Sequence, residues 1–345
     1  MSDGDRAQGG DTTGSGAGGG AAGGGPTGAG PTGGGPAEAG GVSGGDPTRS
    51  ADGALARGAG RLRVELDGVP ETLLWNLVHR AAEAGRPPGK RLLDDPLAVD
   101  LVDRIDYPFD RFGAPVMAQW HALRVRAFDD EVRRFAAEHP GGTVVALGEG
   151  LETQFWRVDD GRLRWLTVDL PETVAVRAAL LPDDPPRRRT VARSALDLAW
   201  MDEISAADAA KGVLVTAQGL LMYLPERDAK GLIAACARRF PGGWFLFDTL
   251  PRAQVAQSRK TPADGRRGGY RAPRWEWGMD YREYPKVASA SPLITRVRSL
   301  PFRRGRGLYA LAPLSHRIPG VRSMRMSIIS VRFGAADPLA RDTGE

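Results

Sequence analysis

The sequence predicts an α/β fold with a doubly wound, mostly parallel sheet, and three observations support this class. Segments with the patterns of strands and helices alternate through the middle of the chain, as in parallel sheets with crossover helices. The stretch Thr143 to Leu147 lacks polar alternation, which is typical of a strand covered on both faces. It runs into a glycine turn, Gly148-Glu149-Gly150, and Asp169 lies at the end of the next expected strand, 21 positions after Gly148. This spacing is typical of a nucleotide-binding half.

Apolar periodicity and turn residues place the individual elements. The expected helices cover residues 70–85, a short stretch within 92–103, 119–139, 171–180 and 227–240. For the fourth of these, Pro171 in the first turn and Glu172 near the positive end favour a helix start. The expected parallel strands cover residues 143–147, 163–168, 190–195, 212–217 and 244–247. The segment SIISVRF at residues 327–333 predicts a last strand, placed as an antiparallel edge of the sheet.

Composition divides the 345 residues into four regions. Of the 46 glycines, 23 fall within the first 60 residues, which carry almost no large apolar side chain. Such a segment cannot offset its ordering entropy by burial, and it lacks the pattern of a secretory signal. We therefore expect a disordered tail at residues 1–61. A helical N-terminal cap at 62–140, a cofactor-binding α/β core at 141–255 and a substrate-covering region with the final strand at 256–345 follow it.

Residue counts exclude several classes of site. Cys236 is the only cysteine, so no disulfide can form within the chain, and the four histidines lack the spacing of zinc ligands. We expect no metal site and a location in a reducing cytoplasm. There is no apolar run of about 18 residues, so no membrane span is expected.

The chain is basic, with a net charge of +5 and a pI of about 9.6. Its densest basic run is Arg187, Arg188 and Arg189. We interpret this run as a solvated face, with a patch for an anionic substrate or nucleic acid as the alternative. Because no nucleic-acid-binding motif accompanies the run, no nucleic-acid partner is expected.

The glycine turn narrows the choice of nucleoside. Dinucleotide folds show G-x-G-x-x-G, in which the helix N-terminus meets a pyrophosphate. Thr153 stands where the third glycine would fall, so the loop suits a ligand without a pyrophosphate. S-adenosylmethionine meets this requirement. It offers a ribose for Asp169, an adenine for the tip of the third strand near Asp197, and an amino-acid end for the glycine loop.

Six blocks of the chain resemble the leucine carboxyl methyltransferase-like family, and within it the tetracenomycin-type polyketide O-methyltransferases. The blocks are LLDDPLA (92–98), RVRAFDDEV (124–132), VVALGEGLETQFWR (144–157), VDLPE (168–172), SALDLAW (194–200) and QGLLMYL (218–224). The resemblance spans about residues 64 to 255. It implies a Rossmann-like class I methyltransferase fold and a methyltransferase that uses S-adenosylmethionine.

The resemblance also implies roles for single residues. Arg124 would bind the cofactor carboxylate, for which a bidentate guanidinium is suited. The glycine turn would lie against the methionine part, Asp169 would hold the ribose, and Asp197 with the Leu198 backbone would face adenine. The implied cofactor-binding residues are Arg124, Gly148, Glu149, Gly150, Asp169, Leu170, Asp197, Leu198 and Gln218.

Three residues depart from the pattern of the family. Gln218 stands where members typically have Glu. The side chain near the cofactor ammonium or the substrate is therefore neutral at this position rather than negatively charged. Glu149 and Glu152 replace an Ala-Asp pair. Glu149 adds a carboxylate inside the glycine turn, which either meets the cofactor ammonium or sulfonium or points to solvent. Asp129 and Arg157, which recur in the matching blocks, are interpreted as a structural pair that braces the cofactor-binding helix.

The implied activity is O-methylation of a small-molecule acceptor, such as a polyketide, at a carboxylate or a hydroxyl. A carboxylate needs no general base, whereas a phenol benefits from one. His79 and Tyr223 are the catalytic candidates, each with a structural role as the alternative. Methylation of a protein C-terminal carboxylate and cofactor binding without catalysis remain open as other functions. An NAD-dependent oxidoreductase is the least favoured because of Thr153. The sequence does not indicate an oligomeric state.

Overall fold

The main sheet of the protein has seven strands in the order β6-β5-β4-β7-β8-β10-β9. The computed structural model describes residues 55–58, 60–64, 71–112, 115, 117–260, 273–315, 317–318, 320 and 325–335, which all belong to one compact unit. The strands are β4 (Thr143–Leu147), β5 (Arg164–Asp169), β6 (Arg188–Ala192), β7 (Val213–Ala217), β8 (Trp244–Thr249), β9 (Ile294–Leu300) and β10 (Ser327–Phe333). The first five are parallel, and β10 is antiparallel to both β8 and β9. The predicted doubly wound, mostly parallel sheet is therefore confirmed.

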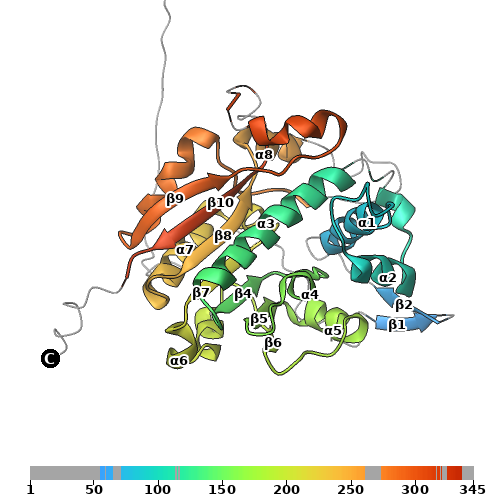
Figure 1. The fold of residues 1–345 in the computed structure, drawn as a ribbon, viewed down its shortest axis with the longest axis horizontal. Coiled ribbons are helices and arrows are strands. Elements are labelled where there is room, and N and C mark those ends of the chain that lie inside the picture. Colours follow the sequence, from blue (N-terminus) through green and yellow to red (C-terminus); the bar gives the residue numbers. More distant parts are fainter. Residues whose placement is uncertain are drawn as a thin grey trace, which may run out of the picture. The chain divides into compact units, whose positions relative to one another are not determined.

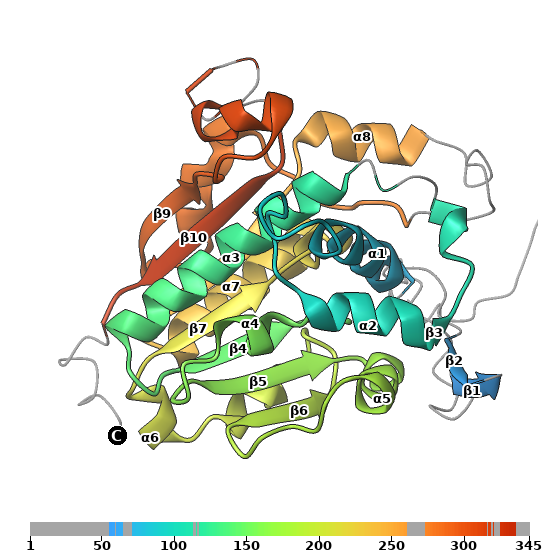
Figure 2. The same cartoon turned by 45° about the vertical axis from the view of Figure 1, so that its right-hand side comes forward.

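Helices cover both faces of this sheet (Figure 1). The α-helices are α1 (Thr72–Ala84), α2 (Pro96–Arg104), α3 (Ala118–Glu138), α4 (Gln154–Val158), α5 (Pro171–Leu180), α6 (Ala206–Ala209), α7 (Glu226–Arg239) and α8 (Arg252–Lys260). Short 3-10 helices are η2 (Phe109–Phe112), η3 (Leu198–Glu203), η4 (Leu221–Tyr223), η5 (Tyr281–Ala290) and η6 (Gly307–Leu314). The long helix α3 crosses one face of the sheet and α7 lies on the other, while α1 lies beside the first half of α3 (Figure 2).

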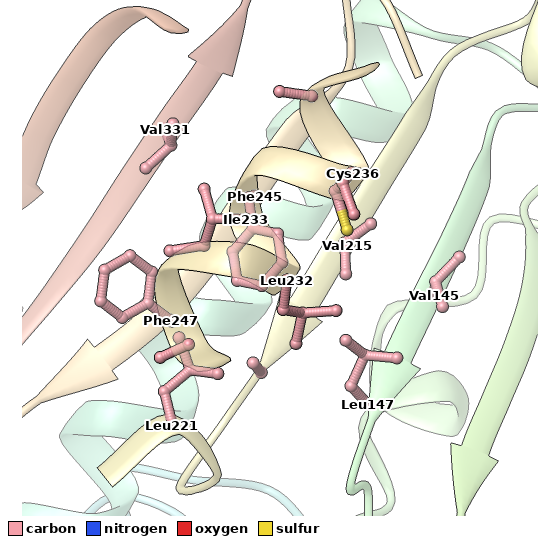
Figure 3. Close-up of a cluster of buried hydrophobic side chains, with 14 of the residues drawn as sticks. Val145, Leu147, Val215, Leu221, Leu232, Ile233, Cys236, Phe245, Phe247 and Val331 are labelled. Carbon is pink, nitrogen blue, oxygen red and sulfur yellow. The ribbon is translucent and has the colours of Figure 1, made fainter. Parts of the chain in front are cut away.

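The central strands are buried on both faces because successive side chains point to opposite sides of the sheet. Val144 packs with Phe128 and Phe135 of α3, whereas Val145 packs with Leu232 of α7. Figure 3 shows the α7 side of the core, where side chains of α7 meet those of β4, β7 and β8. Cys236 lies in this cluster, and burial raises the pKa of its thiol.

The structure corrects the placement of two strands. The third parallel strand, expected at residues 190–195, runs instead over Arg188–Ala192. The last strand is antiparallel as predicted, but β9 covers its outer side, so β9 is the edge. β9 was missed because two arginines, the exposed Arg296 and the half-buried Arg298, break the apolar pattern, and such charges are usual on an edge strand.

A second, small sheet, with two strands before α1 and one after α2, was not predicted. Its strands are β1 (Leu55–Gly58), β2 (Arg61–Val64) and β3 (Ile105–Asp106), in the order β1-β2-β3. β1 lies inside the stretch expected to be disordered, so that expectation is wrong for residues 55–58. Residues 1–54 lie outside the described residues. None of the helices in the described part of the chain has the length and apolar character needed to cross a bilayer.

Phe247 offers a test of the core on the α7 side. Its ring is fully buried and stacks on Trp277, with centroids 5.9 Å apart. We expect Phe247→Ala to lower the free energy of unfolding by about 3–5 kcal/mol, because a buried ring is replaced by a cavity. Urea denaturation followed by circular dichroism measures this loss. Arg227→Ala, at a side chain that is 85% exposed, should change stability by no more than about 0.5 kcal/mol. A similar loss in both variants would contradict this description of the core.

Candidate functional site

A cavity of about 590 Å³ lies at the carboxyl ends of the parallel strands. Its walls are the segments after β4, β5, β6 and β7, together with α1. β4 lies between β5 and β7. The chain runs from β4 through β5 to β6 on one side and then returns to form β7 on the other side of β4. This is the switch point at which open α/β sheets bind ligands.

The glycine turn forms the floor of the cavity in a conformation that needs both glycines. Gly148 and Gly150 have φ angles of 58° and 56°, in the left-handed region that glycine adopts most readily. A Cβ on Gly148 would lie 3.0 Å from Leu220 Cδ1, and one on Gly150 would lie 3.1 Å from Leu73 Cβ. Helix α1 therefore packs directly over the turn.

Asp169 ends β5 at the edge of the cavity, as the sequence predicts. Its Oδ2 accepts a hydrogen bond from Gly150 N at 2.7 Å, and its Oδ1 accepts one from Leu170 N at 2.8 Å. Burial raises the pKa of this carboxyl to about 6, although the two backbone N–H groups favour the ionised form. Leu170 also lines the cavity and is partly exposed.

Glu149 is buried and does not point to solvent, which excludes one of the two alternatives for this side chain. Its carboxylate lies 3.0 Å from Arg177 Nη2 and 3.4 Å from Arg188 Nη2, and it accepts a hydrogen bond from Thr167. Arg177 also donates to the carbonyl oxygen of Gly150. Two guanidinium groups thus neutralise the carboxylate through Oε2, whereas Oε1 is buried without a hydrogen-bond partner among the described residues.

The arginine run at residues 187–189 does not form a free basic patch, and only part of it is solvated. Arg188 is buried beside Glu149, while Arg187 pairs with Asp159 at 2.7 Å and Arg189 with Glu203 at 2.9 Å. Each guanidinium therefore has a carboxylate partner.

Glu152, on the other side of the turn, belongs to a second buried network. Its Oε1 lies 2.7 Å from Arg157 Nη1 and 3.1 Å from Arg80 Nη1, and its Oε2 accepts a hydrogen bond from Gln218 Nε2 at 3.0 Å. Burial alone would raise the pKa of Glu152, but the two arginines lower it to about 2. Gln218 lines the cavity, and its Oε1 is buried without a hydrogen-bond partner among the described residues.

The second network continues into the N-terminal helices. Asp95 accepts hydrogen bonds from Arg80 and Arg157 at 2.7 and 2.9 Å and also caps α2 through Ala98 N. Arg157 Nε donates to Asp129 Oδ2 at 2.9 Å. The predicted Asp129–Arg157 brace on α3 is confirmed.

Arg124, on α3, lines the cavity but is already paired. It donates from Nη1 to Asp248 Oδ2 at 3.0 Å and from Nη2 to Asn76 Oδ1 at 3.1 Å. Asp248 also accepts from Gly219 N at 2.6 Å. Any anion bound here would meet a guanidinium that the protein has oriented and partly neutralised.

Asp197 and Leu198 are not among the described residues that line the cavity, so their place beside the adenine stays a prediction. The wall there consists of residues 193–196. Asp197 is exposed, pairs with Arg193, and accepts from Ala199 N at 3.2 Å at the start of η3. The hydrogen bond from Arg193 lowers the pKa of Asp197. The Asp197 side chain therefore caps η3 and pairs with Arg193.

The two catalytic candidates differ in position. His79 does not line the cavity. It stacks on His121 with ring centroids 4.8 Å apart and a 7° interplanar angle, and burial lowers its pKa to about 4. Tyr223 lines the cavity, but burial raises the pKa of its phenol, while hydrogen bonds with Trp275 and Thr72 act in the opposite direction. Neither side chain is a base poised near neutral pH.

Several residues of the site were not predicted. Three of them, Arg80, Asn76 and Arg177, lie on helices. The periodicity of a helix shows which face is buried, but it does not show that a polar side chain points toward the cavity. Asp248 had one available signal, because it is an acid at the end of a strand, as Asp169 is. No cluster of three or more side chains able to hold a metal ion occurs among the described residues.

Comparison with known proteins identifies the family. The leucine carboxyl methyltransferase profile matches residues 74–237. The tetracenomycin polyketide synthesis O-methyltransferase TcmP of Streptomyces glaucescens is 32% identical over 189 residues, which cover 54% of this chain and 68% of TcmP. The chain belongs to the leucine carboxyl methyltransferase family. It is an S-adenosylmethionine-dependent methyltransferase with a Rossmann-like fold.

Solved methyltransferases are similar at a more distant level. One from Thermobifida fusca is 15% identical with a TM-score of 0.47, over 75% of this chain and 94% of that chain. The N-methyltransferase NodS from Bradyrhizobium japonicum, solved with S-adenosylhomocysteine, is 12% identical with a TM-score of 0.39, over 77% of this chain and 99% of that one. Likeness at this level adds nothing about the acceptor.

Arg177 offers a test of the charge balance under the glycine turn. We expect Arg177→Met to lower the free energy of unfolding by about 3 kcal/mol or more, because a buried carboxylate loses a partner. Chemical denaturation measures the change. The matched control is Arg189→Met, which removes a guanidinium from an exposed pair and should cost about 1 kcal/mol at most. Equal losses would show that the Glu149 pair is no more important than a surface contact.

Proposed function

We propose that the protein transfers a methyl group from S-adenosylmethionine to an oxygen of a small molecule, such as a polyketide, within the cavity at the carboxyl edge of the sheet. The observation that carries the proposal is Asp169, a buried carboxylate at the strand tip beside a glycine turn in the left-handed conformation. This arrangement suits a ribose with a flexible amino-acid chain. The relationship to TcmP, named for polyketide synthesis, favours a polyketide acceptor.

The side chains around the cavity fit the parts of the cofactor. Asp169 would accept hydrogen bonds from the ribose hydroxyls, and the glycine turn would receive the methionine chain against its backbone. The free Oε1 of Gln218 would accept from the ammonium, and Arg124 would bind the carboxylate. Leu170 offers an apolar wall for the adenine at the β5 tip. The bound cofactor supplies an electrophilic methyl group on a sulfonium.

The lining also bears on the chemistry of the acceptor. It includes no histidine or lysine among the described residues. The carboxylates of Glu149 and Glu152 are held by arginines, Asp169 is occupied by the ribose in this proposal, and the Tyr223 phenol stays protonated. The protein can therefore position an acceptor oxygen and exclude water, but it offers no free base. An acceptor that is already ionised at neutral pH, such as a carboxylate, suits this site best, since positioning supplies much of the rate enhancement.

Asp169 provides a test of the cofactor site. We expect Asp169→Asn to weaken S-adenosylhomocysteine binding by about tenfold or more, because hydrogen bonds to a charged acceptor are lost. In the unchanged protein, binding should weaken as pH falls through about 6, since the ribose hydroxyls favour the carboxylate and the free protein becomes protonated there. At pH 5 the affinity should be about a tenth of that at pH 7.5.

Isothermal titration calorimetry from pH 5 to 8 measures both effects. The amide that Asp169→Asn introduces cannot titrate, so binding to the variant should not change with pH across this range. If the variant binds as tightly as the unchanged protein, with the same pH dependence, Asp169 is not the ribose ligand.

The acceptor is tested by transfer of a labelled methyl group to a panel of aromatic polyketide acids. Each acid is paired with its amide and with a matched phenol, and products are identified by mass. We expect transfer to the acids at a rate that is nearly constant from pH 6.5 to 8.5, because the acceptor is already ionised. Labelling only of a peptide C-terminus, or only of the phenols with a rate that rises with pH, would contradict the proposed acceptor.

A further inference from the structure

We infer that Glu152 is a positioning residue that fixes the orientation of the Gln218 amide and thereby turns Gln218 Oε1 toward the cofactor ammonium. The inference rests on the proposed function, because it presupposes that the amino-acid end of the cofactor lies at Gln218. It assigns a role to Glu152, whose carboxylate is held by two arginines at the wall of the cavity.

The geometry determines which end of the amide faces Glu152. An amide can present either its NH2 group or its oxygen, and the two are distinguished only by their partners. Glu152 Oε2 lies 3.0 Å from Gln218 Nε2. An ionised carboxylate has no hydrogen to donate, so the NH2 group of Gln218 must face it. The carbonyl oxygen then occupies the other position.

Two arginines keep Glu152 in the state that this orientation requires. Arg80 and Arg157 both contact Oε1, the oxygen that Gln218 does not use. Both arginines are in turn held by Asp95, at 2.7 and 2.9 Å. The arginines favour the ionised form of Glu152. Its Oε1 binds the two arginines, and its Oε2 accepts the hydrogen bond from Gln218.

The orientation leaves the amide oxygen of Gln218 unsatisfied beside the cavity. Gln218 Oε1 is buried and has no hydrogen-bond partner among the described residues. A buried acceptor without a donor is unfavourable, so a ligand that supplies an N–H group gains from binding there. An ammonium has three such donors. If the amide turned over, its NH2 group would face the ammonium and repel it.

The test reverses the hydrogen bond. In Glu152→Gln, the arginines hold the new amide by its oxygen, so its NH2 group meets Gln218 and forces that amide to turn. We expect S-adenosylhomocysteine affinity to fall about 10- to 100-fold. In Gln218→Glu, two carboxylates oppose each other and affinity also falls. In the double variant Glu152→Gln/Gln218→Glu, the new amide donates to the new carboxylate, and affinity should return to within about threefold of that of the unchanged protein.

Binding of 5′-methylthioadenosine separates positioning from folding, because this ligand has the nucleoside but no amino-acid end. We expect all three variants to bind it as the unchanged protein does, in calorimetry at pH 7.5. The control Glu203→Gln, in an exposed pair with Arg189, should leave the binding of both ligands unchanged.

Other outcomes of these binding measurements would contradict the role of Glu152 or the proposed function. If Glu152→Gln weakens both ligands equally, or if the double variant does not recover, Glu152 has only a structural role and the inference is wrong. The inference also fails if Glu152→Gln binds S-adenosylhomocysteine normally. If the unchanged protein binds neither ligand, the proposed function itself fails, and with it the basis of the inference.

Discussion

The glycine turn depends on the neutralisation of two carboxylates that it brings into the interior. Both Glu149 and Glu152 are removed from water, and an isolated buried carboxylate is strongly unfavourable. Each meets two guanidinium groups, one pair on either side of the turn: Arg177 and Arg188 for the first, Arg80 and Arg157 for the second. Charge balance therefore determines the shape of the turn as much as the conformational freedom of its glycines.

The same balance connects elements that are distant in the chain. The four arginines come from α1, α4, α5 and β6, so the turn can form only when these elements have assembled around it. Leu73 then packs directly on Gly150. As a result, one wall of the cavity belongs to α1, and the position of that wall follows from the charged network as well as from apolar packing.

The sequence predicted backbone structure well, because strands and turns leave a pattern of residue types. It predicted less well which way a given side chain points. The buried strand β4, the glycine turn after it and Asp169 at the tip of β5 follow from periodicity and spacing, and the structure has all three. The direction of His79 does not follow from them. A helical histidine among apolar residues looks the same whether it faces a cavity or another histidine, and here it stacks on His121. Likewise, a run of arginines does not reveal that Arg188 turns inward to pair with Glu149.

Cys236 has a practical consequence for the study of this enzyme. It is the only cysteine in the chain and is fully buried, with a thiol that burial keeps protonated. Because thiolates on the surface are what maleimides attack, the folded protein presents no competing target. A cysteine introduced on the exposed side of β9, for example at Arg296, would accept a single fluorophore without removal of the native residue. Ligand-dependent movements could then be followed from one defined position.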